Sequence, residues 1–240
     1  MPQRILLSDA HEKNRISDDL KETLESIGTI RRMRKETYLF REGMNANEVF
    51  IIKSGLVQVS KLTAEGKKLT LRICKTGDII GELTLFSQNP TYLLSAKVIE
   101  SGEILVIEKD RLEKHLKKNG DLAIEFMKWG SDHMRKFQTK IRDLLLNGKK
   151  GALYSTLIRL SNSFGIKHHG GILIDLPLTN QELAQFCAAT RESVNRMLSE
   201  LRKLNIISMT KEGKIFIKNI NYLKTENGCE NCPVEICNIN

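Results

Sequence analysis

Three of the chain's five cysteines are gathered in one short stretch near its C-terminal end. Cys229, Cys232 and Cys237 follow the spacing C-x2-C-x4-C, whereas Cys74 and Cys187 stand alone among apolar residues and are expected to be buried thiols. Thiolates bind zinc and iron–sulfur clusters, and structural disulfides are rare in a reducing cytoplasm. The spacing therefore predicts a metal or cluster site, with a flexible thiol tail as the alternative.

A second candidate site lies in a pattern of helix, turn, helix and hairpin. A capping box, T-x-x-E from Thr179, opens the first helix, and Thr190 can cap a second helix over 191–204. Two β-branched runs ending at Ile217 then form a hairpin. The apolar positions expected to form the shared core are Leu183, Phe186, Val194, Leu198 and Leu201. This order is typical of a winged helix-turn-helix.

The N-terminal end of the second helix carries the side chains that would read DNA. They are Arg191, Glu192, Ser193, Asn195 and Arg196. Arginine can bond O6 and N7 of guanine, and glutamate can accept from N4 of cytosine. The net charge is +9, and residues 150–224 hold 11 Lys and Arg against 5 Asp and Glu. The sequence therefore predicts binding to double-stranded DNA, with a solvated helix face that binds nothing as the alternative.

Two further elements precede this pattern. From Tyr38 to Ile107 short β-branched runs alternate with turn signals, and glycines recur every 11 or 12 residues, which is typical of an all-β roll. From Asn119 to Asn147 apolar residues recur at heptad spacing, at Ala123, Met127, Gly130, Met134, Phe137, Ile141 and Leu144. This seam favours a homodimeric coiled coil over a helix that packs only on its own chain.

The expected architecture is α+β, with a sensor-like domain, a dimerisation helix, a DNA-binding domain and a tail. Gly148 to Gly151 is expected to stop the long helix and to act as a hinge. The expected parts are a leading helix to about residue 28 with the β-roll (1–118), the long helix (119–148), the winged helix-turn-helix (149–222) and the cysteine-rich tail (223–240).

The composition excludes several classes of protein. The 240 residues are 40% hydrophobic and 28% charged, and no apolar run approaches the ~20 residues that span a bilayer. No Ser/His/Asp or paired-carboxylate pattern marks an active site, and a redox pair at Cys229 and Cys232 lacks a βαβ scaffold. We therefore expect a cytoplasmic protein that is not an enzyme and does not bind membranes.

The β-roll, the long helix and the winged helix-turn-helix together resemble the cAMP receptor protein and FNR family of bacterial transcription regulators, over nearly the whole chain. The segment from Arg191 to Arg196, R-E-S-V-N-R, matches the family pattern R-E-T-V-x-R. The resemblance implies that Arg191, Glu192 and Arg196 read bases in a TGTGA-like half-site of a palindrome, and that the dimer activates transcription through RNA polymerase. Asn195 departs from the known subtypes.

The β-roll departs from the family's cAMP binders at one position. Gly81-Glu82-Leu83 resembles the G-E-L of the phosphate cassette, but Leu94 stands where the R-S-A triplet has its arginine. That arginine pairs with the cyclic phosphate, whereas leucine offers neither charge nor donor. The chain is therefore expected to have no cAMP site and Glu82 a structural role. Another small molecule or a haem is the alternative effector.

The C-terminal cysteines, with Pro233 after the second, resemble the Bacillus-type branch of the family, whose anaerobic regulators carry a [4Fe–4S] cluster. The resemblance implies such a cluster on Cys229, Cys232 and Cys237. The cube needs a fourth ligand. The candidates are Asp143, His133, His168, His169 and an exogenous small molecule. The resemblance implies an aspartate of the dimer helix, which is Asp143; a zinc staple on the same cysteines is the alternative.

Overall fold

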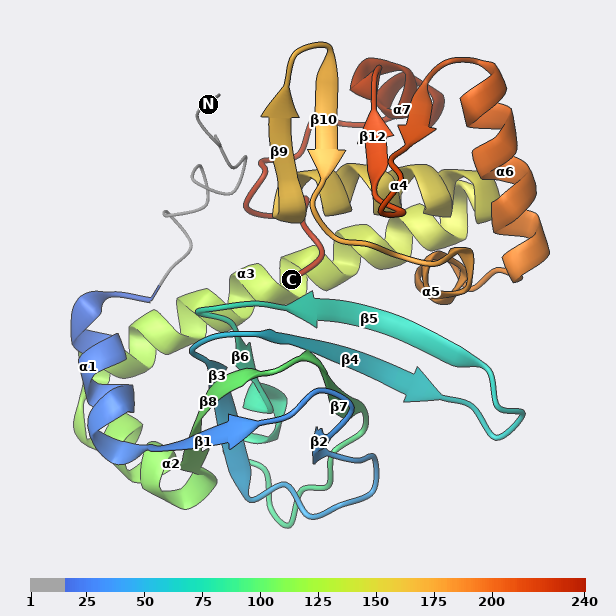
Figure 1. The fold of residues 1–240 in the computed structure, drawn as a ribbon. Coiled ribbons are helices and arrows are strands. Elements are labelled where there is room, and N and C mark those ends of the chain that lie inside the picture. Colours follow the sequence, from blue (N-terminus) through green and yellow to red (C-terminus); the bar gives the residue numbers. More distant parts are fainter. Residues whose placement is uncertain (1–15) are drawn as a thin grey trace. The chain divides into compact units, whose positions relative to one another are not determined.

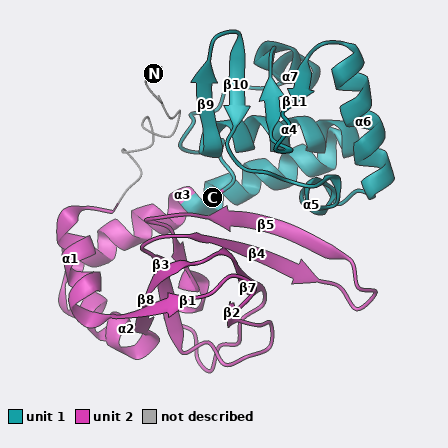
Figure 2. Cartoon of the chain, in the orientation of Figure 1, with its two compact units in different colours: residues 1–14, 133–239 teal, residues 15–132, 240 magenta. Residues whose placement is uncertain are grey.

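The computed structural model describes residues 16–240, which form two compact units. One unit contains residues 16–132 with Asn240, and the other contains residues 133–239 (Figure 2). Helices and antiparallel sheets are mixed in the chain (Figure 1), which confirms the predicted α+β class. Helix α1 (Asp18–Ile27) is the described part of the predicted leading helix, since residues 1–15 of that prediction lie outside the described residues.

The first unit is built on two four-stranded antiparallel sheets, as the strand and turn rhythm predicts. The first has the order β1 (Thr29–Met33), β8 (Gly102–Glu108), β3 (Glu48–Ile52) and β6 (Ile79–Ile80). The second has the order β2 (Tyr38–Phe40), β7 (Ser95–Glu100), β4 (Leu56–Leu62) and β5 (Lys68–Cys74). A short 3-10 turn, η2 (Glu82–Thr84), follows β6.

Strand β3 shows why the roll has two cores. Phe50 and Ile52 join the cluster between the two sheets, while Val49 and Ile51 join the cluster on the opposite face. Side chains alternate across a strand, so a continuous apolar run is buried on both faces. Helix α1, helix α2 (Lys109–Lys118) and the first half of α3 (Gly120–Leu146) contribute to the second cluster.

Helix α3 covers the predicted heptad segment almost residue for residue. Its exposed large apolar side chains are Ile124, Met127, Met134, Ile141, Leu145 and Leu146. Exposed apolar side chains that recur along one helix in this way, called here the exposed apolar stripe, are typical of an interaction surface. No helix of the described residues, α3 included, is long and apolar enough to cross a membrane.

The second unit contains the predicted winged helix-turn-helix. Its helices are α4 (Gly148–Phe164), α5 (Asn180–Phe186), α6 (Arg191–Lys203) and α7 (Ile220–Glu226). Its sheet has the order β11 (Ile207–Met209), β12 (Ile215–Ile217), β10 (Gly171–Ile174) and β9 (Gly165–His168). Strands β11 and β12 are the predicted hairpin, whereas β9 and α7, like α2 in the first unit, were not predicted.

The break between α3 and α4 is shorter than the predicted stop at Gly148 to Gly151. Only Asn147 separates the helices, and residues 149–151 already belong to α4. Gly148 has a φ of +58°, a left-handed value that glycine adopts without strain. The prediction was wrong in its extent because one residue of this kind is enough to end a helix and restart another.

Gly151 should be sensitive to substitution by alanine. A Cβ there would lie 2.1 Å from Cβ of Asn147 and 2.8 Å from Oδ1 of Asn227. We expect Gly151→Ala to lower the free energy of unfolding by about 1–3 kcal/mol, because the junction must shift to make room. Urea unfolding of the metal-free protein measures it. Gly120→Ala, which meets nothing within 4 Å, is the control and should cost nothing. Equal stabilities of the two variants would contradict the expectation.

Candidate functional site

The tail starts with a turn that ends α7 and sets the position of Cys229. The N–H of Gly228 donates to the carbonyl of Thr225 (3.0 Å), and the N–H of Cys229 donates to the carbonyl of Lys224 (2.8 Å). Gly228 has a φ of +56°. This pattern is a glycine C-cap, which turns the chain sharply away from the helix axis.

A second turn places Cys237 on α4. The N–H groups of Ile236 and Cys237 both donate to the carbonyl of Pro233 (2.9 Å each). Asn162 of α4 then donates through Nδ2 to the carbonyl of Cys237 (2.5 Å), and the N–H of Ile239 donates to Oγ of Ser163 (3.0 Å). The last part of the tail is therefore fastened to one helix of its own unit.

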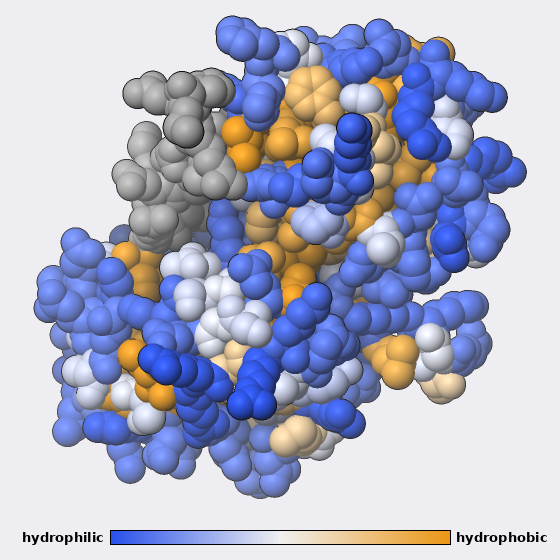
Figure 3. Space-filling model, viewed as in Figure 1, coloured by the Kyte–Doolittle hydropathy of each residue, from blue (hydrophilic) through white to orange (hydrophobic). Residues whose placement is uncertain are grey.

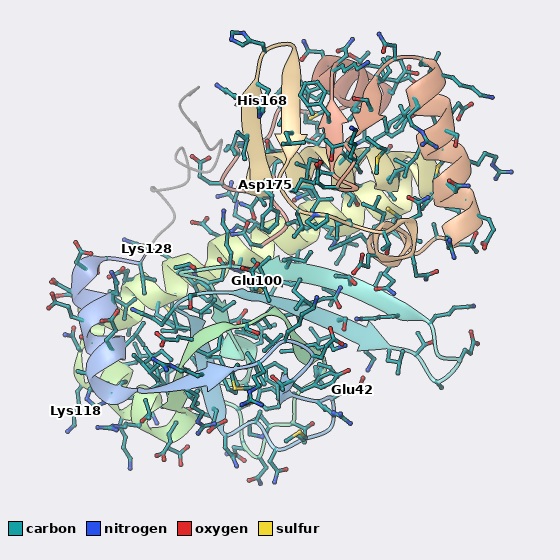
Figure 4. All side chains as sticks on the ribbon, viewed as in Figure 1. Glu42, Glu100, Lys118, Lys128, His168 and Asp175 are labelled. Carbon is teal, nitrogen blue, oxygen red and sulfur yellow. The ribbon has the colours of Figure 1, made fainter. Side chains whose placement is uncertain are left out.

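The three cysteines of the tail and Asp143 line one cavity of about 200 Å³. Asp143 comes from the last turn of α3 and Cys229, Cys232 and Cys237 from the tail, so segments 86 residues apart or more meet here. The lining does not include the three candidate histidines, His133, His168 and His169, and His168 lies at the end of β9 (Figure 4).

The four side chains share this cavity without converging on one point. Among residues 16–240, no three His, Cys, Asp or Glu side chains are arranged closely enough to hold a metal ion. The donor set nevertheless fits the predicted group: iron–sulfur clusters take thiolates, and iron also accepts carboxylate oxygen. The residues therefore have the ligand types that a cluster needs, and they line the same cavity. Their side chains would have to move closer together to bind it.

Asp143 is buried and fully engaged. Its Oδ2 accepts from Oγ of Ser155 (2.5 Å) and from Nη2 of Arg159 (2.9 Å), and its Oδ1 accepts from Nη2 of Arg142 (3.1 Å). Burial alone would raise the pKa of this carboxyl, but these bonds outweigh burial and lower its pKa. The carboxylate is therefore ionised near neutral pH.

The pKa of Cys237 depends on the other residues that line the cavity. Burial raises the pKa of its thiol; Arg159 opposes the rise, and negative charge on Cys229, Cys232 and Asp143 adds to it. The four groups therefore lie within electrostatic reach of one another. A positive group bound among them would relieve this repulsion.

Arg159 and Ser155, which hold Asp143 from α4, were not predicted from the sequence. Arg159 stands between Ile158 and Leu160 in a helix whose other side chains in this stretch are buried, and it is itself 2% exposed. A lone arginine within a run of apolar helical residues could have indicated this role in the sequence, because a buried guanidinium requires hydrogen-bond acceptors for all its nitrogen atoms.

The two helices of the DNA-binding pattern have the predicted caps. Thr179 and Glu182 form the capping box of α5, and Thr190 accepts from the N–H of Ser193 at the start of α6. The five predicted core side chains are all buried, and Cys187 is buried beside them. The helix-turn-helix is therefore held by one shared apolar core.

The start of α6 presents polar side chains outward. Arg191, Glu192, Asn195 and Arg196 are exposed and Ser193 is half-buried. Asn195 accepts through Oδ1 from Nδ2 of Asn180 (3.1 Å), which ties the α6 surface to the start of α5. Helix α6 lies at the right of Figure 1, and this edge is hydrophilic in Figure 3.

In the β-roll, Glu82 is occupied by a partner from its own chain. Nη1 of Arg72 donates to Oε1 of Glu82 (3.1 Å), and both side chains are buried. Leu94 is half-buried against the core between the sheets. The roll has a cavity of about 390 Å³, but neither Glu82 nor Leu94 lines it. Glu82 is thus paired within the roll, and the absence of a cAMP site stays a prediction.

Lys140 is a buried cation of α3 in the second unit. Its Nζ lies 5.1 Å from the ring centroid of Phe186 in α5, and the residue is 8% exposed. Burial and the charge of Arg159 lower the pKa of Lys140 to about 7, against a smaller opposing effect of Cys187. Lys140 therefore changes charge near neutral pH.

The fold and these surfaces define a DNA-binding transcription regulator with a sensor-type β-roll. Residues 30–119 match the family model of the cyclic nucleotide-binding domain, and residues 151–226 match that of the Crp-like helix-turn-helix domain. The chain is 64% identical over 224 residues to the anaerobic regulatory protein of Bacillus subtilis, with 93% of this chain and 94% of that protein covered. The chain belongs to the CRP/FNR family of transcription regulators.

More distant relatives agree with this assignment. The lactate racemization regulatory protein of Lactiplantibacillus plantarum is 29% identical over 82% of this chain and 90% of its own length. Among solved structures, FixK2 from Bradyrhizobium japonicum superposes with a TM-score of 0.73 at 20% identity, covering 84% of this chain and 98% of that one. This last similarity shows the shared fold alone.

The stability of the second unit should depend on pH through Lys140. Between about pH 7 and 10 the unfolded chain binds a proton at this lysine that the folded chain does not, so the free energy of unfolding rises with pH in that window. We expect Lys140→Met to raise stability near pH 7 by about 1–3 kcal/mol and to flatten this rise. Thermal unfolding at a series of pH values measures it.

Lys128→Met is the matched control, since Lys128 is exposed on the same helix (Figure 4). It should leave the slope of the wild-type protein unchanged. A Lys140→Met variant with the slope of the wild type would show that Lys140 keeps an ordinary pKa.

Proposed function

We propose that this chain is an oxygen-responsive, anaerobic transcription regulator of the cytoplasm whose DNA affinity is controlled by a [4Fe–4S] cluster. The observation that carries the proposal is that Cys229, Cys232, Cys237 and Asp143 line one cavity. The 64% identity to the anaerobic regulatory protein of Bacillus subtilis supports the anaerobic response.

Each side of the cavity would contribute its own ligands. The tail would supply three thiolates, and the end of α3 would supply one carboxylate oxygen from Asp143. When bound, the cluster supplies an oxygen-labile link between the tail and α3. Asp143 lies four residues before the junction at Asn147, so this link would bear on the helix that leads into the DNA-binding domain.

We further propose that the chain acts as a homodimer on a palindrome. The exposed apolar stripe of α3 provides the surface for a second copy. Two α6 helices must stand about 34 Å apart to enter successive major grooves. Arg191, Glu192 and Arg196, with Ser193 and Asn195 beside them, would read a TGTGA-like half-site, and the bound dimer would activate transcription through RNA polymerase.

We propose no cAMP response. Glu82 is paired with Arg72, and Leu94 offers no donor to a phosphate. Control by the cysteine site accounts for a roll that keeps the family's fold without its nucleotide arginine.

Iron analysis and DNA binding test the proposal together. Protein purified without oxygen should be brown and hold about four iron and four sulfide per chain. It should bind a TGTGA palindrome at least about tenfold more tightly than the metal-free protein at the same salt concentration. Asp143→Ala should retain less iron, because it leaves the cube one ligand short.

Asp121→Ala, an exposed position in the first turn of the same helix, is the control and should keep the iron. A colourless zinc protein would overturn the cluster and favour a zinc staple on the same cysteines. Equal DNA affinities with and without the cluster would overturn its regulatory role.

The recognition helix can be tested separately with a single arginine. We expect Arg191→Ala to weaken binding to the palindrome by about 1–3 kcal/mol and to relax selectivity at one base pair, because a bidentate contact to guanine is lost. Arg202→Ala is the control, since Arg202 lies in the last turn of α6 and donates to Ser199 (2.8 Å). Competition binding with single-base variants of the site measures both. An equal, sequence-independent loss in the two variants would count against base reading by Arg191.

A further inference from the structure

Arg159 makes the most extensive polar contacts around the cavity, although the proposed cluster does not use it as a ligand. It lies in the middle of α4 and is 2% exposed. All its partners are oxygen atoms: Oγ of Ser155 (3.1 Å), Oγ1 of Thr139 (3.1 Å), Oδ2 of Asp143 (2.9 Å) and the carbonyls of Ile236 (3.3 Å) and Asn238 (3.5 Å).

These contacts use every nitrogen of the guanidinium. Nε donates to Ser155, Nη1 to the two carbonyls, and Nη2 to Thr139 and Asp143. Such complete pairing matters because a buried charge without partners is strongly destabilising. The side chain is therefore held in one geometry, and it holds its partners in turn.

Apart from Ser155 of its own helix, the partners of Arg159 come from the two segments that the proposed cluster would connect. Thr139 and Asp143 belong to α3, whereas Ile236 and Asn238 flank Cys237 in the tail. Arg159 therefore joins the carboxylate ligand to the third cysteine through α4, and it does so with protein atoms alone.

The two parts of the tail differ in how they are attached. The Cys237 arm, residues 233–239, is held by Arg159 and by Asn162, and its Ile236 and Ile239 are 5% and 2% exposed. The Cys229 arm, residues 228–232, is half-buried or exposed, and its Glu230 pairs with Arg142, whose side chain is 34% exposed. The Cys237 arm thus has the stronger protein anchor.

We propose that Arg159 is a positioning residue of the cysteine site, which keeps the Cys237 arm on α4 and Asp143 beside it whether or not a cluster is bound. The part that concerns the cluster rests on the proposed function. The guanidinium would also offset the negative charge of three thiolates and a carboxylate. Loss of the cluster would then release the Cys229 arm from α3 and leave the Cys237 arm in place.

Hydrogen–deuterium exchange of the metal-free protein tests the anchor without any cluster. In the wild type the amides of Ile236, Cys237 and Ile239, which donate hydrogen bonds, should be protected. Arg159→Met should speed their exchange about tenfold or more, with circular dichroism and thermal unfolding showing that the unit is folded. Arg142→Met is the matched control, because Arg142 also binds Asp143 but contacts Glu230 instead of the Cys237 arm. Unchanged exchange in folded Arg159→Met would overturn the proposal.

Arg159→Lys provides a second test of the anchor if Arg159→Met does not fold. Lysine retains the charge but cannot reach both carbonyls and Asp143 in the same fork geometry. The exchange rates of the Ile236, Cys237 and Ile239 amides should then lie between those of the wild type and those of fully unprotected amides. Exchange rates in this variant equal to those of the wild type would also overturn the role assigned to the forked guanidinium of Arg159.

The loaded protein tests whether the anchor acts on the cluster. After anaerobic loading with ferrous iron and sulfide, Arg159→Met should lose iron to a ferrous chelator about 10–100-fold faster than the wild type. Its cluster should also have a lower reduction potential, since a buried positive charge is removed, and Arg159→Lys should restore the potential in part. Wild-type iron loss and potential in both variants would overturn the action on the cluster.

The measurements on metal-free and on loaded protein distinguish the role of Arg159 as an anchor from the proposed cluster function. If the wild type itself takes up no iron and sulfide, the proposed function and the action on the cluster fail together. The exchange data on metal-free protein still decide whether Arg159 anchors the tail.

Discussion

The buried ion pair between Arg159 and Asp143 is the interaction on which the architecture of residues 133–239 depends. The two side chains are 3% and 8% exposed and lie 2.9 Å apart. Removing one partner of such a pair leaves an uncompensated buried charge, which costs about 3–5 kcal/mol. Asp143 at the end of α3 and Arg159 in the middle of α4 must therefore stay in contact. The tail must stay with them, because its carbonyl groups accept hydrogen bonds from Arg159.

Periodicity and local chemistry predicted the parts of the fold that repeat. Val49 to Ile52 form a continuous apolar run because β3 is buried on both faces, and the spacing from Met127 to Ile141 follows one face of α3. The capping box at Thr179 was readable because its hydrogen bonds are local. Cys229, Cys232 and Cys237 were predicted as ligands from their type and spacing, and the family resemblance led to Asp143. All four line one cavity, and their role as ligands stays a proposal.

The rest depended on contacts between residues far apart in the chain. Arg159 has its role through Asp143, 16 residues before it, and through Ile236, 77 residues after it, and no local pattern encodes such partners. Lys140 looks like an ordinary helical lysine until Phe186 and Arg159 are placed around it. Helix α2 was missed because only Leu112 and Leu116 mark its buried face within a strongly charged segment.

The junction at Asn147 has a mechanical consequence. With a single residue between α3 and α4, the direction of α4 is set by very few backbone dihedral angles, and Gly148 contributes one of them at a φ of +58°. A small rotation about these bonds is multiplied along the length of α4 and of the elements that pack on it. The same rotation therefore displaces the recognition helix α6 by a distance that grows with its separation from Asn147. Close packing of Asn147 and Asn227 against Gly151 restricts this rotation and so limits the displacement of α6.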